Sequence, residues 1–323
     1  MRAIRVETYG GPEVLRVHDL EPPQPGPGEV LVDVAASGVN YVDTYQRSGT
    51  YQIPLPFLSG VEGAGTVTAL GDGVTDLEVG DRVGWVAAPG SYAEQVLLPA
   101  DKAIPVPEGV PLDVAAAVLL QGLTAHYLST STYPVQAGDT ALVHAAAGGV
   151  GLLLTQMVGK LRGGRVIATV SSEEKAALAR AAGADELIRY DQADFAAEVL
   201  RLTADEGVQV VYDGVGRSTF EGSLASLRRR GLLVLYGAAS GPVPPFDPIR
   251  LMAGSFFLTR PTLAHYTATR DELLTRAHAV FDWVAAGRLA VRIGGRYALS
   301  DACKAHEDLQ GRRTTGKLLL VPG

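Results

Sequence analysis

Hydrophobic positions follow a strand-like pattern in the first third of the chain. Up to about residue 101, short runs rich in Val, Leu and Ala alternate with turns rich in Gly and Pro. Val30, Val32 and Val34 recur at every second position, as in a half-buried strand. Many short strands between turns favour a compact barrel-like module. The strands expected in this part cover residues 2–8, 14–20, 29–38, 63–70, 82–86 and 92–98.

The spacing becomes helical between residues 111 and 128, and from residue 139 strands and helices alternate. Alternation of this kind predicts a doubly wound parallel sheet. The expected strands are 141–144, 165–170, 186–190, 208–213, 232–237 and 255–259, and the expected helices are 152–161, 173–182, 195–202 and 219–229. Gly183 is expected to end the second of these helices in a left-handed conformation. The tail predicts a helix over 270–286, a helix over 300–310 and a closing strand over 317–321, and we expect it to return to the first domain.

A glycine-rich turn lies between the first strand of the parallel sheet and its helix. Ala146-x-Gly148-x-x-Gly151 has the spacing of a dinucleotide-binding turn, with alanine in the first position. The physical requirement is that a pyrophosphate reaches backbone N–H groups at the positive end of a helix, where side chains would block it. The alternative interpretation is a tight turn that binds nothing.

The end of the second strand indicates which nucleotide is bound. An NAD site usually carries an acidic residue there for the ribose 2′-hydroxyl, and the run from Thr169 to Val170 is followed by Ser171 and Ser172 instead. Together with Lys175, these serines could hold a 2′-phosphate, so NADPH is the expected cofactor. The alternative is structural, because Ser171-x-x-Glu174 also fits a capping box and Lys175 could be a solvated charge.

Composition and charge exclude several other classes of protein. The chain has 323 residues, 47% hydrophobic and 20% charged, with a net charge of −7, so it is a globular protein without a basic surface for nucleic acid. Cys303 is the single cysteine, and the six histidines show no metal-ligand spacing, so we expect no metal site. No G-x-S-x-G motif occurs. No apolar run is long enough to span a membrane and residues 1–5 contain no apolar signal core, so a cytoplasmic location is expected.

Several segments in matching order resemble the quinone oxidoreductases, the zeta-crystallin-like branch of the medium-chain dehydrogenase/reductase superfamily. They are residues 10–15, Gly38 to Tyr45, residues 121–125, His144 to Gly151 and residues 312–317. The resemblance implies an α/β protein with a GroES-like β-barrel catalytic domain and a Rossmann domain, NADPH as cofactor, and a homodimer. It implies domain limits of 1–122 for the first part of the catalytic domain, 123–262 for the Rossmann domain and 263–323 for the return. Zinc-dependent relatives carry a cysteine near Asn40 and a histidine near Val61, so the resemblance also implies a reaction without metal.

Site residues are carried over by position within this resemblance. Tyr41 to Tyr45 should border the nicotinamide; Asn40 should bind the ribose or ring edge; and Tyr45 could donate to the substrate carbonyl. Catalytic roles are expected for Tyr45, Asn40 and Tyr51. The other expected cofactor contacts are Tyr41, Asp43, Thr124, Tyr127, Ala147, Gly148, Gly149, Val150, Ser171, Ser172, Lys175, Tyr190, Val215, Gly237, Ala238, Ala239, Ser240, Phe257, Leu258, Thr259 and Lys317.

Purely structural roles are the alternative for some of these residues. Tyr45 and Tyr51 could be surface aromatics, and Asn40 could stabilise a turn. Asp43 could pair with local N–H groups, and Lys317 could be a free surface charge. Phe257 could belong to the core, and Tyr190 could pack at a strand end.

The implied reaction is direct hydride transfer from nicotinamide C4 to a quinone or another activated carbonyl substrate. The protein would contribute alignment and exclusion of water. Two alternatives stay open: an NADPH-dependent enal, enone or enoyl-thioester reductase, and an NADPH-binding protein with a structural or RNA-binding role. The resemblance further implies a dimer joined through the edge strand near Phe256 and Phe257.

Overall fold

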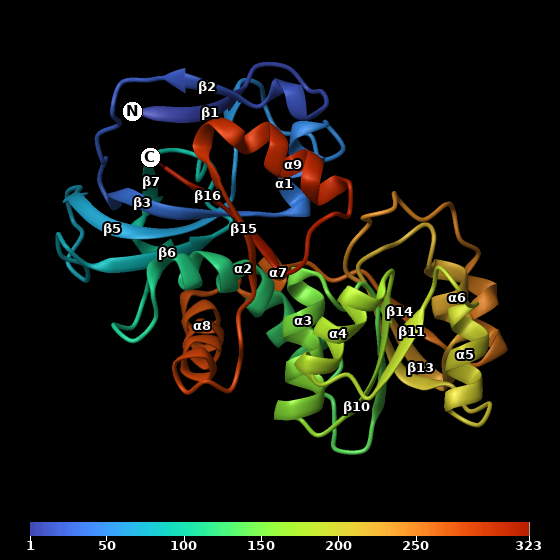
Figure 1. The fold of residues 1–323 in the computed structure, drawn as a ribbon. Helices are drawn as coiled ribbons and strands as arrows, with labels where there is room; N and C mark the ends of the chain where they lie inside the picture. Colours follow the sequence, from blue (N-terminus) through green and yellow to red (C-terminus); the bar gives the residue numbers. More distant parts are fainter. Residues whose placement is uncertain (323) are drawn as a thin grey trace. The chain divides into compact units, whose positions relative to one another are not determined.

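The computed structural model describes residues 1–322 and divides the chain into two compact units (Figure 1). The first unit contains Met1–Leu120, Thr269–Gly287 and the chain from Val291 onward. The second unit contains Gln121–Ala268 with Arg288–Ala290. The functional roles attached to the expected domain limits stay a prediction. Within residues 1–322, no helix is both long and apolar enough to cross a membrane.

The second unit is built on one six-stranded sheet in the order β11-β10-β9-β12-β13-β14. All of its strand pairs are parallel. The strands are β9 (Thr140–Val143), β10 (Arg165–Val170), β11 (Glu186–Arg189), β12 (Val208–Asp213), β13 (Leu227–Leu235) and β14 (Phe257–Thr259). The order reverses between β9 and β12, which confirms the doubly wound parallel sheet.

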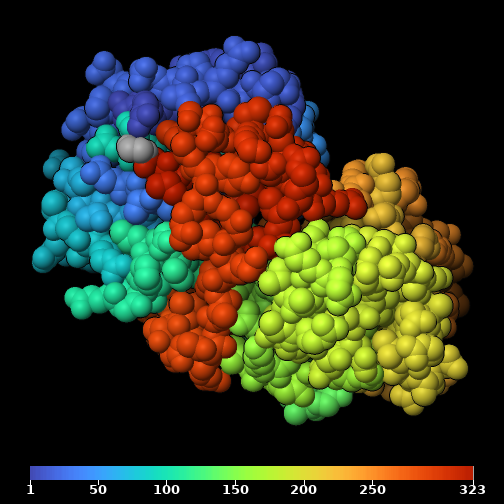
Figure 2. Space-filling view, in the orientation of Figure 1, coloured from blue at the N-terminus to red at the C-terminus, as the bar shows by residue number. Residues whose placement is uncertain are grey.

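Helices connect the strands of this sheet, because parallel neighbours need a crossover. They are α3 (Gly149–Gln156) with the π-helix η4 (Met157–Leu161), α4 (Glu173–Ala182), α5 (Phe195–Leu202), α6 (Phe220–Ala225), η5 (Pro248–Ala253) and α7 (Leu263–Tyr266). Yellow-green side chains of the α3 to α5 segments form a continuous outer surface of the unit (Figure 2). Gly183 ends α4 with φ 108°, as expected. The core between sheet and helices includes Leu142, Ile167 and Val211.

Two helix boundaries differ from the sequence prediction. The first helix begins at Gly149 rather than at residue 152, so two of its first residues are glycines. The helix expected over 219–229 ends at Ala225, because Leu227 already pairs with Val208 as the start of β13. The expected helix continued to Arg229, but strand pairing with β12 outweighs helix propensity there. Arg230 has φ 60°, where the ladder is irregular.

The first unit contains a three-stranded sheet, β2-β1-β4, and a larger one in the order β15-β16-β3-β5-β6-β8, with β7 paired to β3. Its strands are β1 (Arg2–Val6), β2 (Arg16–Asp19), β3 (Glu29–Val39), β4 (Phe57–Leu58), β5 (Glu62–Leu70), β6 (Arg82–Val86), β7 (Gln95–Pro99), β8 (Ile104–Pro105), β15 (Ile293–Ala298) and β16 (Lys317–Val321). The last strand, β16, pairs antiparallel with β3, which brings the end of the chain back to its beginning.

The helices of this unit are short, apart from two of sixteen residues each. They are η1 (Pro12–Val14), α1 (Tyr41–Arg47), η2 (Ala100–Lys102), α2 (Leu112–Tyr127, which continues into the second unit and is followed by η3, Leu128–Thr132), α8 (Arg270–Ala285), η6 (Leu299–Asp301) and α9 (Ala302–Gln310). Helix α1 follows β3 directly, so the sheet fixes where α1 begins. The buried side chains of Tyr92 and Leu299 belong to an apolar cluster that also contains Ala302 and Ala305 of α9.

Candidate functional site

The glycine turn of the second unit leaves the first N–H groups of α3 without a side-chain cap. Gly148 stands at the N-cap in an extended conformation, and no described side chain accepts from the helix there. The turn is held from within, since Gly148 N–H donates to Ala145 O at 2.8 Å and Ala146 N–H donates to Thr169 O at 3.2 Å. A helix N-terminus of this kind attracts phosphate. The positions of Ala147, Gly148, Gly149 and Val150 therefore fit a pyrophosphate.

The backbone around one glycine of this segment, Gly151, leaves no room for a side chain. A Cβ on Gly151 would lie 2.3 Å from Ala145 O, whereas a Cβ on Gly149 would meet the movable end of the Gln121 side chain, 1.9 Å from Oε1. Ala145 itself has φ 50°, which is unusual for a residue with a side chain. Only glycine allows the helix to start this close to the turn.

A buried hydrogen-bond chain under this turn escaped the sequence analysis. Asp213 Oδ2 accepts from Ser223 Oγ at 2.8 Å, and Ser223 Oγ lies 3.0 Å from His144 Nε2. His144 Nδ1 lies 2.9 Å from Thr169 Oγ1. Because the single hydroxyl proton of Ser223 goes to the carboxylate, Nε2–H of His144 donates to Ser223, and Nδ1 accepts from Thr169.

Burial lowers the pKa of His144, against the opposite influence of Asp213, so the ring is neutral as this chain requires. This series of hydrogen bonds links the carboxyl ends of β9, β10 and β12. The sequence did contain a signal: His144, Thr169 and Asp213 are polar residues at or just after the ends of three buried strands. Polar groups at that edge of a parallel sheet mark the ligand-binding side.

The expected 2′-phosphate residues lie together at the end of β10. Lys175 Nζ donates to Ser171 Oγ at 3.2 Å, and the Ser172 side chain accepts from Lys175 N at 3.3 Å. Ser172, rather than Ser171, is therefore the N-cap of α4, which corrects the capping box expected from Ser171. Tyr190 follows the neighbouring strand β11 and is 41% exposed. Its contact with a cofactor stays a prediction.

The loops after β12 and β13 are joined by hydrogen bonds. Ser240 N–H and Ser240 Oγ both donate to Val215 O at 2.8 Å, and Ala239 N–H donates to Gly214 O at 3.2 Å. Val215 N–H in turn donates to Asp213 Oδ1 at 2.8 Å. The structure thus brings Val215 together with the segment Gly237, Ala238, Ala239 and Ser240.

Other expected cofactor contacts of this unit have different surroundings. Leu258 and Thr259 are partly buried in β14, whereas Phe257 is 60% exposed, so the alternative that Phe257 belongs to the core is wrong. Thr124 is 8% exposed. Tyr127 is only 2% exposed and stacks on Tyr266, with ring centroids 4.3 Å apart, and its expected diphosphate contact stays a prediction. Its burial raises the pKa of Tyr127.

In the first unit, α1 and the loop after it carry three of the expected tyrosines. The ring centroids of Tyr45 and Tyr51 are 5.2 Å apart in an edge-to-face arrangement, and those of Tyr41 and Tyr45 are 6.3 Å apart. Tyr41 donates its hydroxyl to Leu309 O at 3.2 Å. Tyr51 is 46% exposed, and Tyr45 is partly buried. Such a cluster presents aromatic surface on which a planar ring can pack.

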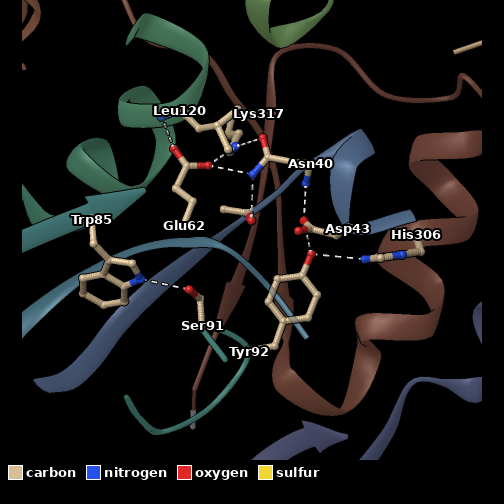
Figure 3. A network of polar contacts seen from close by, with 10 residues as sticks. Asn40, Asp43, Glu62, Trp85, Ser91, Tyr92, Leu120, His306 and Lys317 are labelled. Atoms are coloured by element: carbon tan, nitrogen blue, oxygen red, sulfur yellow. Dashed lines mark hydrogen bonds and ion pairs between the residues drawn. The ribbon is translucent and has the colours of Figure 1, made fainter. Parts of the chain in front are cut away.

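A buried polar network surrounds the start of α1 (Figure 3). Lys317 Nζ donates to Asn40 Oδ1 at 2.7 Å and forms an ion pair with Glu62 Oε2 at 2.5 Å. Asn40 Nδ2 donates to the same Glu62 Oε2 at 2.8 Å, and Glu62 Oε1 accepts from Leu120 N at 2.6 Å. Gly38 makes room for the pair, since a Cβ there would lie 2.2 Å from Glu62 Oε2. Every one of these groups has a partner, as buried charge requires.

The network continues to the other side of α1 through Asp43. Asp43 Oδ2 accepts from Asn40 N and from Tyr92 Oη, each at 2.8 Å (Figure 3). Tyr92 Oη lies 3.1 Å from His306 Nε2, and Arg47 Nη1 lies 3.3 Å from His306 Nδ1. Arginine can only donate, so Nδ1 of His306 accepts, its Nε2–H donates to Tyr92, and Tyr92 donates to Asp43. Burial lowers the pKa of His306 to about 3, with a further contribution from Arg47, which agrees with a neutral ring.

These contacts correct three expectations. Asp43 is 0% and Lys317 1% exposed, so neither side chain is available for direct contact with a cofactor, and Lys317 is not a free surface charge. Asn40 is 4% exposed, and its amide is occupied by Glu62, Gly38 and Lys317, so its side chain holds the start of α1. Glu62, Tyr92, Arg47 and His306 were missed, because contacts across more than 200 positions leave no local signal in the sequence. Among the residues described, no group of three or more His, Cys, Asp and Glu side chains could hold a metal.

Known proteins resemble the chain along its whole length. The alcohol dehydrogenase GroES-like domain family matches residues 26–108, and the zinc-binding dehydrogenase family matches residues 149–286. A structure of a mycobacterial protein in complex with NADPH is 53% identical, with a TM-score of 0.97 over 100% of both chains. The structure of an Escherichia coli quinone oxidoreductase in complex with NADPH is 40% identical, with a TM-score of 0.97 over 100% of both chains.

A quinone oxidoreductase from Pseudomonas aeruginosa is 46% identical over 99% of both chains. The parallel sheet with its glycine turn and the β-rich first unit agree with this similarity. The chain therefore belongs to the quinone oxidoreductases of the medium-chain dehydrogenase/reductase superfamily.

Proposed function

We propose that this protein is an NADPH-dependent quinone reductase. One observation carries the proposal. The uncapped N-terminus of α3 follows β9, and the neighbouring strand β10 is followed by Ser171, Ser172 and Lys175. Relatives that share 40–53% of the sequence are solved with NADPH or named quinone oxidoreductases. NADPH, when bound, supplies a hydride from nicotinamide C4 to the quinone.

The residues of this chain hold and orient the cofactor in the proposal. Backbone N–H groups from Gly148 to Val150 bind the pyrophosphate, and the neutral His144 chain keeps that turn fixed. Ser171, Ser172 and Lys175 bind the 2′-phosphate. Tyr45 and Tyr51 face the acceptor ring, and Tyr45 is the candidate proton donor to the product oxygen.

The expected quaternary structure and location are part of the same proposal. A homodimer through the edge strand β14 is supported by the exposed apolar side chains Ile249, Met252 and Phe257 near that edge. A cytoplasmic location is supported by the single cysteine, which suits a reducing compartment.

The cofactor assignment predicts a selective effect of Lys175→Ala. Loss of the lysine removes a charge-assisted contact to the 2′-phosphate, so NADPH should bind about 10- to 100-fold more weakly. NADH lacks that phosphate and should lose about twofold or less. Fluorescence titration with both nucleotides measures the two dissociation constants. Arg180→Ala removes an exposed charge from the same helix and should change neither. Equal losses for NADPH and NADH in Lys175→Ala would contradict the assignment.

The acceptor class is tested on the unmodified protein. We expect NADPH oxidation with 1,4-naphthoquinone to have a higher kcat/KM than with crotonaldehyde-type enones. A higher value with the enones would favour the enone reductase instead. Tight binding of NADPH without turnover of any acceptor would favour the structural alternative.

A further inference from the structure

In the first unit, the hydroxyl of Tyr9 forms hydrogen bonds with both the N–H and the C=O group of Ile53. Ile53 N–H donates to Tyr9 Oη at 3.1 Å, and Tyr9 Oη donates to Ile53 O. The two residues are 44 positions apart. A paired contact of this kind from one hydroxyl does not follow from the secondary structure, since Ile53 lies outside every helix and strand. Tyr9 therefore fixes the middle of the loop that follows α1.

The same segment also holds the beginning of that loop. Gly10 N–H donates to Arg47 O, at the last residue of α1, over 3.1 Å. Gly49 has φ 76°, and a Cβ there would lie 2.9 Å from Cγ of the Tyr9 ring, so the ring lies close to the backbone of Gly49. Loop residues 48–53 are thus held at two points by Tyr9 and Gly10.

Between these two points stands Tyr51. Its N–H donates to Tyr45 O at 3.0 Å, and its ring meets the Tyr45 ring at an interplanar angle of 63°. Almost half of the side chain, 46%, is exposed. Without a clamp, an exposed loop tyrosine would sample several rotamers, and ordering it on binding would cost affinity.

We propose that Tyr9 is a positioning residue that sets acceptor specificity, by holding Tyr51 against Tyr45 as a preformed aromatic face for a planar quinone ring. The inference rests on the proposed acceptor role of Tyr45 and Tyr51. A fused bicyclic quinone covers more of this face than a monocyclic one, so it depends more on the order of the loop. Tyr9 itself touches the loop and acts on the acceptor through Tyr51.

Tyr9→Phe tests the clamp, because it removes both hydroxyl contacts and keeps the ring on Gly49. The KM for 1,4-naphthoquinone should rise about fivefold, and that for 1,4-benzoquinone by about twofold or less. The kcat with each quinone, the KM for NADPH and the unfolding temperature should stay close to those of the wild type. A purely structural role would lower the unfolding temperature and affect both quinones alike, and that result would overturn the proposal.

Two further variants separate the possible outcomes. Tyr297→Phe removes another hydroxyl contact of the same unit, to Asp308, and should leave both quinone KM values unchanged. Tyr51→Ala should raise the KM for naphthoquinone at least as much as Tyr9→Phe does. If Tyr51→Ala has no effect, the aromatic acceptor site of the proposed function is wrong. If Tyr51→Ala raises KM and Tyr9→Phe does not, the acceptor site stands and the role of Tyr9 is wrong.

Discussion

Asp43 shows how the environment of a single residue decides its chemistry. The carboxyl group is fully buried, and within the described part of the chain its Oδ1 has no hydrogen-bond partner. Burial raises its pKa to about 7, although hydrogen bonds from Tyr92 and Asn40 and the charge of Lys317 oppose the shift. Since Tyr92 and Asn40 both donate to Oδ2, an added proton would sit on Oδ1. Asp43 is thus a buried acid that titrates near neutral pH.

This pKa predicts an unusual pH dependence of stability. In the unfolded chain Asp43 ionises near its ordinary pKa of 3.8, whereas in the folded protein it keeps its proton up to about pH 7. The folded state therefore binds more protons between these values, and the contribution of Asp43 to stability falls as pH rises from about 4 to 7. Asp43→Asn removes this titration and keeps an acceptor for Tyr92. Relative to the wild type, the variant should gain roughly 1–4 kcal/mol between pH 4 and pH 7.

Urea unfolding of the two proteins across this pH range measures the difference. The variant must be compared with the wild type because the titration of His306 changes stability with pH in the opposite direction. Its pKa is about 3 in the fold and ordinarily 6.5, so its stabilising contribution is lost as pH falls from about 6.5 to 3. The Asp43→Asn variant retains His306, so that slope cancels in the difference. A difference that does not change with pH would contradict the raised pKa of Asp43.

At the scale of elements, the helix α3 depends on glycine at positions where a helix normally avoids it. Gly149 and Gly151 stand in its first turn, although glycine lowers helix stability by about 1 kcal/mol. The space around Gly151 explains the choice there, because the backbone of the neighbouring turn leaves no room for a Cβ; at Gly149 a Cβ would displace the side chain of Gln121. These glycines lower the stability of the first helical turn and leave its backbone N–H groups accessible.

Gly151→Ala should disturb this turn. Its Cβ would meet Ala145 O at 2.3 Å and Ala146 Cα at 2.8 Å, and backbone atoms can yield only if the turn moves. We expect a loss of stability of about 1–3 kcal/mol and NADPH binding weaker by about tenfold or more. Calorimetry and fluorescence titration measure the two effects. Gly109→Ala is the control, because a Cβ there has no neighbour within 4 Å. Unchanged binding in Gly151→Ala would show that the turn is not the phosphate site.

At the scale of the whole molecule, one edge of the parallel sheet stands out by its exposed apolar side chains. The sheet ends at β14, where Phe257 is 60% exposed, and the preceding η5 exposes Ile249 at 64% and Met252 at 76%. An edge strand offers unpaired backbone groups to a second strand. In a symmetric dimer, the same edge of a second copy would pair with these backbone groups and cover the exposed apolar side chains.

Phe257→Glu should therefore give monomers. The charge would be buried without a partner at the centre of the proposed interface, which is strongly unfavourable. Sedimentation at micromolar concentration should show a dimer for the wild type and a monomer for the variant. Val79→Glu, at a site 64% exposed in the first unit, should remain a dimer. A monomeric wild type, or a dimeric Phe257→Glu, would rule out this interface.

The sequence by itself determined the parts of this protein that depend on local periodicity and small motifs. Strand and helix spacing predicted the doubly wound sheet, and the run from Ala145 to Gly151 predicted a phosphate turn that the geometry of α3 fits. Ser171 and Lys175 are four positions apart, so their contact could be foreseen.

Only the tertiary structure decided which polar residues are buried and with which partners. Lys317 is a charged residue at the start of a strand and gave no sign that it would be paired with Glu62, 255 positions away. The same holds for His306 with Tyr92 and for Tyr9 with Ile53. Hydrogen bonds and ion pairs depend on distance in space, which a pattern along the chain does not record until the strands that carry them have paired.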